Sequence, residues 1–144
     1  MVEATGRRCI AVKADTADRD AMDALVARAE AEFGRVDIAV ANAGVSVPAP
    51  ITSMTSAQWN EVISSNLTGV FNTVAAVSGG MAERGYGRII TISSMMGRSG
   101  GTQMAAYGAS KWGRHRFDEE CVARTGKLGC DRECYCTGGT SRRR

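Results

Sequence analysis

Two hydrophobic patterns alternate along this chain, and their order limits the folds open to it. Short apolar runs rich in β-branched residues are followed by longer segments whose apolar residues recur at helical spacing. The runs expected to form strands are Cys9–Val12, Val36–Val40 and Arg88–Ser93. Strand and helix in regular alternation indicate a parallel sheet with helices on its faces. The sequence therefore predicts an α/β fold.

The expected helices begin and end at residues suited to those places. The first spans residues 18–33, and Gly34 closes it. The second begins after Thr55, a capping residue, and ends either near Gly79-Gly80 or at Gly85. The third begins at Ala105, after the glycine-rich turn that follows the last strand. Two of these helices connect successive strands, as a parallel sheet requires.

Composition excludes several classes of protein. The chain has 144 residues, of which 44% are hydrophobic, and this suits a single domain with a core. The net charge of +3 is small and the basic excess lies near the C-terminus, so nucleic-acid binding is not expected. No run approaches the roughly 20 apolar residues of a membrane span, and the first residues do not resemble a signal peptide. We expect a cytoplasmic protein with no membrane partner.

The cysteines crowd toward the end of the chain, at Cys121, Cys130, Cys134 and Cys136, whereas Cys9 stands alone. A disulfide framework would suit a small secreted protein, and no signal peptide points to one. Zinc sites usually combine two C-x-x-C units, but C-x-x-x-C-x-C has no second pair here, and His115 is the only histidine. We expect no metal site, with a small zinc-binding module as an alternative.

The segment around the third expected strand carries side chains suited to proton transfer. Tyr107 and Lys111 lie four residues apart, so a helix places them on one face. An ammonium beside a phenol stabilises the phenolate, and the pair can therefore give and take a proton. Ser93 and Ser94 end the strand that precedes them. This segment is the candidate catalytic centre.

The spacing of Ser94, Tyr107 and Lys111 after a strand resembles the active site of the short-chain dehydrogenase/reductase family, a Ser followed by Tyr-x-x-x-Lys. Other segments resemble motifs of the same family in the same order, namely Asp15-Thr16 after the first strand, Asn42-Ala43-Gly44, and the helix that contains Asn66. The chain is identified as a member of this family from Met1 to about Gly113. The resemblance implies a Rossmann-like, doubly wound sheet.

The resemblance assigns a role to each catalytic residue. Tyr107 would give or take the proton of the substrate oxygen, a general acid–base step worth roughly 10² to 10⁴ in rate. Ser94 would hydrogen-bond that oxygen. Lys111 would assist Tyr107 and hold the nicotinamide ribose, and Asn66 would position a water that relays the proton. The implied reaction interconverts an alcohol and a carbonyl on a small-molecule substrate, and the family is usually homo-oligomeric.

The resemblance also implies NAD or NADP as the cofactor, which supplies or accepts the hydride. The residues expected to contact it are Asp15, Thr16, Asn42, Ala43, Gly44, Tyr107 and Lys111. The first two of these would lie beside the adenine ring. Gly44 has no Cβ, so its main chain permits close approach.

The beginning of the sequence departs from the family pattern. The family fold starts with a strand and a glycine-rich turn that holds the pyrophosphate, and no G-x-x-x-G-x-G occurs here. We therefore expect weak or absent binding of NAD or NADP by this chain. We expect the third, fourth and fifth strands of the sheet, with the first two absent. In the order 3-2-1-4-5-6, the third strand has no neighbour among those present. Cys9–Lys13 is then expected either to remain unpaired or to pair with Val36–Val40.

The end of the sequence departs as well. We expect residues 1–113 to form a partial domain and residues 114–144 to be an atypical, non-native or disordered tail. Residues 114–120 are too polar to continue a core-facing helix on this reading. Their codons, read one base later, permit strings similar to the next helix of the family, so a frameshift after Gly113 is our hypothesis. The alternative to an active oxidoreductase is an inactive remnant that misfolds or associates with intact relatives through its long helices.

Overall fold

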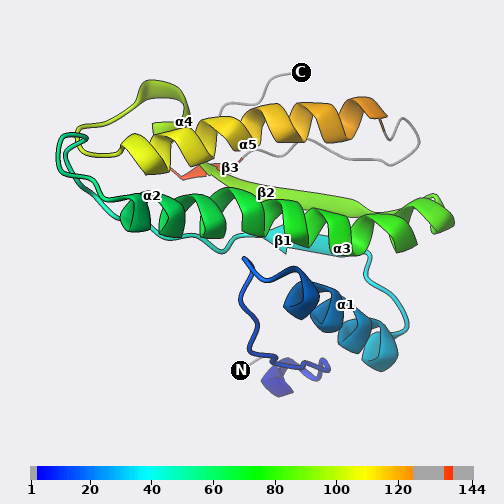
Figure 1. The fold of residues 1–144 in the computed structure, drawn as a ribbon. Coiled ribbons are helices and arrows are strands. Elements are labelled where there is room, and N and C mark those ends of the chain that lie inside the picture. The colour runs from blue at the N-terminus through cyan, green and yellow to red at the C-terminus, as the bar shows by residue number, and fades with distance from the viewer. Residues whose placement is uncertain (1–2, 125–134, 138–144) are drawn as a thin grey trace.

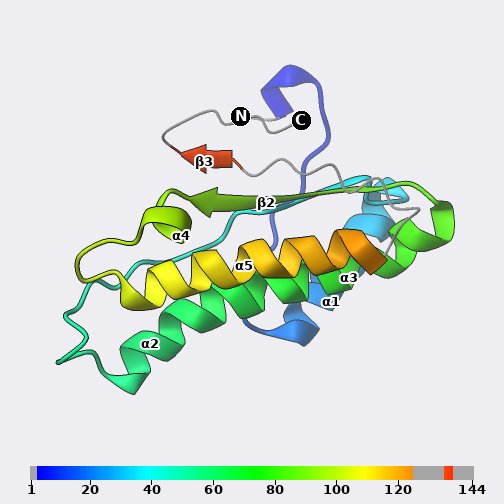
Figure 2. The ribbon, with the colours of Figure 1, turned by 90° about the horizontal axis from the view of Figure 1, so that it is seen from above.

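The computed structural model of the chain describes residues 3–124 and 135–137. Its regular elements, in chain order, are η1 (Glu3–Thr5), α1 (Arg19–Phe33), β1 (Ile38–Ala41), α2 (Ser56–Ile63), η2 (Ser64–Thr68), α3 (Gly69–Arg84), β2 (Arg88–Ser94), α4 (Met96–Ser99), α5 (Ala105–Arg124) and β3 (Tyr135–Thr137). Helices α2, α3 and α5 lie on one side of β1 and β2 (Figures 1 and 2). No described helix is long and apolar enough to cross a membrane.

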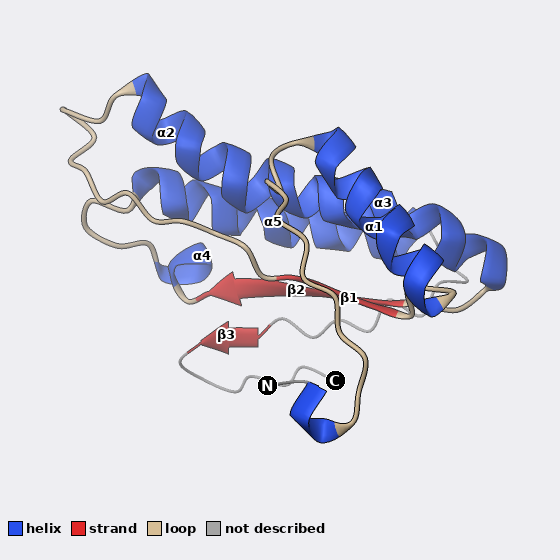
Figure 3. Cartoon of the chain, turned by 90° about the horizontal axis from the view of Figure 1, so that it is seen from below, coloured by secondary structure: helices blue, strands red, loops and turns tan. Residues whose placement is uncertain are grey.

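The described strands form a parallel sheet in the order β1-β2-β3. Strands β1 and β2 pair with Ile38 opposite Arg88, and β2 and β3 pair with Ile92 opposite Tyr135. Element η1 lies on the side of the sheet away from α2, α3 and α5 (Figure 3). The α/β class and the parallel sheet predicted from the sequence are confirmed.

The core lies between β1 and α3. Ala39 packs in one buried cluster with Val77 and Met81 of α3, and Ala41 in a second with Val70 and Val74. The alternate residues of β1 point the other way: Ile38 is 57% exposed and Val40 is 54% exposed. Strand β1 therefore buries one face only, in contrast to the two covered faces usual for a parallel strand.

The expected strand at Cys9–Val12 does not form. These residues have no regular secondary structure, and β1 pairs with β2 alone among the described strands. Of the two outcomes foreseen for this segment, the unpaired one is observed. An extended segment needs a neighbour to satisfy its backbone groups, and Cys9, Ala11 and Val12 are exposed to solvent instead.

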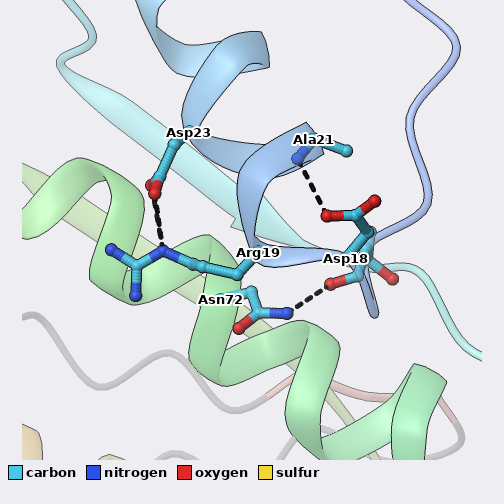
Figure 4. Close-up of polar contacts among 6 residues, drawn as sticks. Asp18, Arg19, Ala21, Asp23 and Asn72 are labelled. Carbon is cyan, nitrogen blue, oxygen red and sulfur yellow. Dashed lines mark hydrogen bonds and ion pairs between the residues drawn. The ribbon is translucent and has the colours of Figure 1, made fainter.

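Local contacts fix both ends of α1. The Asp18 side chain caps the helix by accepting a hydrogen bond from the Ala21 amide at 3.1 Å, and Arg19 pairs with Asp23 one turn on (Figure 4). Gly34 follows the last residue with a φ of 91°, a conformation that favours glycine. The helix predicted for residues 18–33 is thus confirmed almost to the residue.

Helix α5 does not stop at Gly113, and the expectation that the following residues are too polar to continue it is wrong. The helix runs to Arg124. Arg114 is fully buried and donates a hydrogen bond to the Thr91 carbonyl at 2.9 Å. Phe117 meets the Phe71 ring edge to face, with 6.3 Å between ring centroids. A long basic side chain continues the packed face because a strand carbonyl accepts its hydrogen bond. The frameshift itself stays a prediction.

Candidate active site

The site is built around Asn66, which lies in the π-helical segment η2 and is 0% exposed. Its Oδ1 accepts a hydrogen bond from the Val45 amide at 2.7 Å, and its Nδ2 donates to the Val45 carbonyl at 2.9 Å. Nδ2 also donates to Ser110 Oγ at 3.2 Å. A turn wider than that of an α-helix is frequent at functional sites, and here it carries the residue that links three parts of the chain.

These hydrogen bonds limit what the Asn66 side chain can do. An amide nitrogen carries two hydrogens, and both are used within the protein. The side chain therefore has no donor left for a substrate or a relay water. It serves to fix the loop after β1 to the helix that carries Tyr107 and Lys111.

Gly44 lies directly against Asn66 and Lys111. A Cβ at position 44 would be 3.0 Å from Asn66 Oδ1 and 3.7 Å from Lys111 Nζ. Only a residue without a side chain fits this position without a shift. Asn42 and Ala43, which precede it, are exposed. The exposed main chain of this loop, next to a lysine, suits the ribose end of a nicotinamide cofactor.

Lys111 is buried, with 5% of the residue exposed. Its Nζ donates to the Ile92 carbonyl at 3.1 Å and lies 5.5 Å from the centroid of the Tyr107 ring. Burial lowers the pKa of the Lys111 amine, and the positive charge of Arg114 lowers it further. The predicted Tyr–Lys pair therefore exists, with its ammonium placed over the phenol ring.

Ser94 ends β2, two residues beyond the carbonyl that binds Lys111. Its Oγ accepts a hydrogen bond from the Met96 amide at 3.3 Å, at the start of α4. Gly97 of α4 packs on the backbone of Lys111, because a Cβ there would be 3.1 Å from the Lys111 carbonyl carbon and oxygen. The strand end that carries Ser94 is thus held against α5, although no described contact joins Ser94 to Tyr107.

Asp15 and Thr16 lie in the turn before α1. Asp15 Oδ1 accepts a hydrogen bond from the Ala17 amide at 2.9 Å, which is the role of a turn residue. The Thr16 carbonyl accepts from Asn72 Nδ2 at 2.9 Å, and a Cβ on Gly69 would be 2.6 Å from Thr16 Oγ1. Figure 4 shows Asn72 reaching this turn from α3. The turn is therefore docked on α3.

A cavity of ≈320 Å³ lies beside this turn. Thr16 lines it together with Asn42 and Ala43, so residues predicted for the two ends of the cofactor share one space. Most of the other lining residues are apolar and come from α1, β1 and α3. Thr16 and the Asn42–Gly44 loop fit a cofactor in part, whereas Asp15 is used in its own turn.

Three residues of the site were not singled out by the sequence. Ser110 contacts Asn66, Arg114 lies beside Lys111, and His115 Nε2 is 3.1 Å from Ser93 Oγ. Ser110 could have been noticed in the sequence. It lies inside a predicted helix, away from its ends, and a serine hydroxyl in such a place needs a hydrogen-bond partner when it is buried. The other two lie in the stretch read as a tail.

No group of three or more His, Cys, Asp or Glu side chains that could hold a metal occurs in the described part of the chain. Cys9 is free and exposed. The side chains of the late cysteines, Cys121, Cys130, Cys134 and Cys136, lie outside the described residues.

Comparison with known proteins gives a matching family model and several relatives. A family model described as short chain dehydrogenase matches residues 1–142. Nodulation protein G of Azospirillum brasilense is 40% identical over 127 residues, which cover 88% of this chain and 52% of that protein. An acetoacetyl-CoA reductase of Rhizobium meliloti is 49% identical over 88 residues, 61% of this chain and 36% of that protein. A putative ketoacyl reductase of Streptomyces coelicolor is 36% identical over 139 residues, 95% of this chain and 51% of that protein. The chain spans about half the length of the curated relatives it matches.

Proposed function

This chain belongs to the short-chain dehydrogenase/reductase family, and we propose that it carries the proton-transfer half of an NAD(P)-dependent alcohol–carbonyl interconversion. The observation that carries the proposal is the position of Lys111 Nζ, 5.5 Å from the Tyr107 ring centroid and 3.7 Å from where a Cβ of Gly44 would lie. One ammonium thereby serves both the phenol and the loop expected to face the nicotinamide.

In this proposal Tyr107 is the general acid in reduction and the general base in oxidation. Its ring is half-buried, and no described residue hydrogen-bonds its hydroxyl. Lys111 places its ammonium beside the Tyr107 ring, 5.5 Å from the ring centroid. Ser94 would donate its hydroxyl hydrogen to the substrate oxygen, since its Oγ accepts from Met96 through a lone pair. Asn66 positions both the loop and α5.

NAD or NADP would supply the hydride when bound. Gly44, Asn42 and Ala43 would hold its nicotinamide ribose end, with Lys111 donating to the ribose hydroxyls. The Lys111 ammonium has three hydrogens, of which the Ile92 carbonyl takes one. Two donors therefore remain for the phenol and the ribose.

The names of the relatives point to the first substrates to try. Several are acetoacetyl-CoA reductases, and one is a putative ketoacyl reductase. Others are dehydrogenases of hydroxylated rings, such as 2,3-dihydro-2,3-dihydroxybenzoate dehydrogenase of Bacillus subtilis. We propose a short 3-oxoacyl thioester ahead of a cyclic alcohol.

The test is oxidation of NADH or NADPH by the purified chain with acetoacetyl-CoA, followed by absorbance at the nicotinamide band. Tyr107→Phe should abolish turnover. Tyr86→Phe is the matched control, because Tyr86 is 60% exposed and lies outside the site. Turnover that survives Tyr107→Phe would refute the assigned role. No turnover with either cofactor would favour the inactive alternative.

That alternative is a catalytically inactive member that associates with relatives through its long helices. The observation in its favour is exposed aromatic surface on those helices, with Phe71 of α3 at 47% and Trp112 of α5 at 59%. Size-exclusion chromatography of the chain with and without an intact relative would detect such a complex. A monomer under both conditions would count against it.

A further inference from the structure

Ser110 connects the two catalytic segments of the site through its hydroxyl group. Its Oγ donates a hydrogen bond to the Tyr107 carbonyl at 2.8 Å and accepts one from Asn66 Nδ2 at 3.2 Å. Both Ser110 and Asn66 are 0% exposed. The hydroxyl hydrogen and one oxygen lone pair are therefore engaged away from water. These contacts join the first turn of α5 to η2.

The contact is one of three hydrogen bonds that agree on the orientation of the Asn66 amide. Val45 already distinguishes the amide oxygen from the amide nitrogen, because its N–H donates to Oδ1 and its C=O accepts from Nδ2. Because the Ser110 hydrogen is given to the Tyr107 carbonyl, Ser110 can only accept from Asn66. The nitrogen of Asn66 must then face Ser110, and its oxygen must face the Val45 amide. The amide thereby ties the loop after β1 to Ser110 of α5.

We propose that Ser110 is a positioning residue, which accepts the second Nδ2 hydrogen of Asn66 and thereby holds that side chain firmly against the Gly44–Val45 loop. The role deepens the proposed function, since that loop is expected to face the nicotinamide. Without the hydroxyl, one Asn66 hydrogen would be buried without an acceptor, and the side chain would be held by its contacts with Val45 alone. The Val45 amide would then be held less firmly.

The experiment is hydrogen exchange measured by NMR on the full ¹⁵N-labelled chain without cofactor or substrate. In Ser110→Ala, the Val45 backbone amide should exchange on the order of 5- to 10-fold faster, as for the loss of one net hydrogen bond. The amides of Val70 and Val74 in the core should change less than this. Ser78→Ala is the matched control, because Ser78 Oγ bonds the Val74 carbonyl at 2.6 Å within α3 and touches no site residue among those described.

A double-mutant cycle separates positioning from a general loosening of the helix. In an Asn66→Ala background, Ser110→Ala should have no further effect on Val45 exchange, because the proposed coupling runs only through the amide. Additive effects would overturn the proposal. So would a Val45 exchange rate that is unchanged in Ser110→Ala.

A second variant covers the case in which Ser110→Ala does not fold. Ser110→Cys keeps nearly the same volume but offers only a weak acceptor. If the substitution accelerates exchange of the Val45 amide by no larger factor than that of the Val70 amide, the proposal fails. Because these readings need no ligand, absence of enzymatic turnover would count against the proposed function and leave the positioning role standing.

Discussion

Gly44 and Asn66 lie so close that a Cβ on the glycine would be 3.0 Å from Asn66 Oδ1. The loop after β1 and the π-helical segment η2 are therefore in direct contact, and the Asn66 side chain fills the space that a larger residue at position 44 would need. The same loop lies next to Lys111, because a Cβ on Gly44 would be 3.7 Å from Lys111 Nζ.

Gly44→Ala should push the Asn66 amide away from Val45. We expect a loss of about 1–3 kcal/mol in the free energy of unfolding, as for an overpacked buried site. Urea denaturation followed by circular dichroism measures this loss. Gly79→Ala is the matched control with the opposite sign, because nothing lies within 4 Å of a Cβ there and Gly79 is inside α3. That change should stabilise the chain by about 0.5–1 kcal/mol. Equal effects of the two substitutions would contradict the assignment.

Removal of the Arg114 charge should raise the pKa of the Lys111 amine. The pKa is lowered first by burial and then by Arg114, so Arg114→Met should bring it part of the way back toward the ordinary value. The Lys111 side-chain resonances followed by NMR across a pH series would report the change. Arg98→Met is the control, since Arg98 is exposed and is no cause of the shift. An unchanged Lys111 titration in Arg114→Met would show that the two cations do not interact.

The stability of the chain should depend on pH through Lys111 in a defined direction. The folded pKa lies below the ordinary value of 10.5, so between these two values the unfolded chain binds more protons than the folded one. The contribution of Lys111 to stability therefore rises as pH rises through this window. It is constant below the folded pKa, where the cost of burying the charge is complete.

Lys111→Met removes this dependence. The unfolding free energy of the native chain minus that of the variant should become more favourable to the native chain as pH approaches 10.5. Urea melts of both proteins at matched pH values test this sign. A difference that falls with rising pH would mean that the Lys111 pKa is raised in the fold.

Phe117→Ala tests whether the residues after Gly113 belong to the folded core. Phe117 packs on the cluster of Ala41, Val70 and Val74 and meets Phe71 edge to face. Because both rings are only partly buried, we expect a loss of about 1–2 kcal/mol. Thermal unfolding measures it, with Tyr86→Ala on the exposed surface as the control. No effect of Phe117→Ala would support the reading of this stretch as a tail.

The sequence predicted the elements whose pattern is local. The apolar spacing of α1, with Asp18 before it and Gly34 after it, and the β-branched run of β2 each fix an element from a few neighbouring residues. Cys9–Val12 has the same local pattern as a strand, but a strand forms only where a partner accepts its hydrogen bonds. Propensity could not reveal that the partner is missing.

The site was predictable only in part for a similar reason. Tyr107 and Lys111 share a helix face by spacing alone, and the structure places the ammonium over the ring. The contacts of Asn66 with Val45 and Ser110 join residues 21 and 44 positions apart, and no periodicity encodes such pairs. The polar residues after Gly113 were misjudged because the acceptor for Arg114 is a backbone carbonyl, which every sequence contains.

Deletion of one residue from the π-helical segment Ser64–Thr68 should disrupt the site and leave the fold intact. Helices α2, η2 and α3 run without interruption from Ser56 to Arg84. In an α-helix, each residue turns the chain by about 100°, so losing one would rotate every later side chain off its face. A π-turn already holds one residue more than an α-turn, and losing it there would only regularise the helix. Val70 and Val74 would still face the sheet, while Asn66 would leave the loop it now holds. Loss of the extra residue of the π-turn would therefore disrupt the site around Asn66 and preserve the packing of the helix on the sheet.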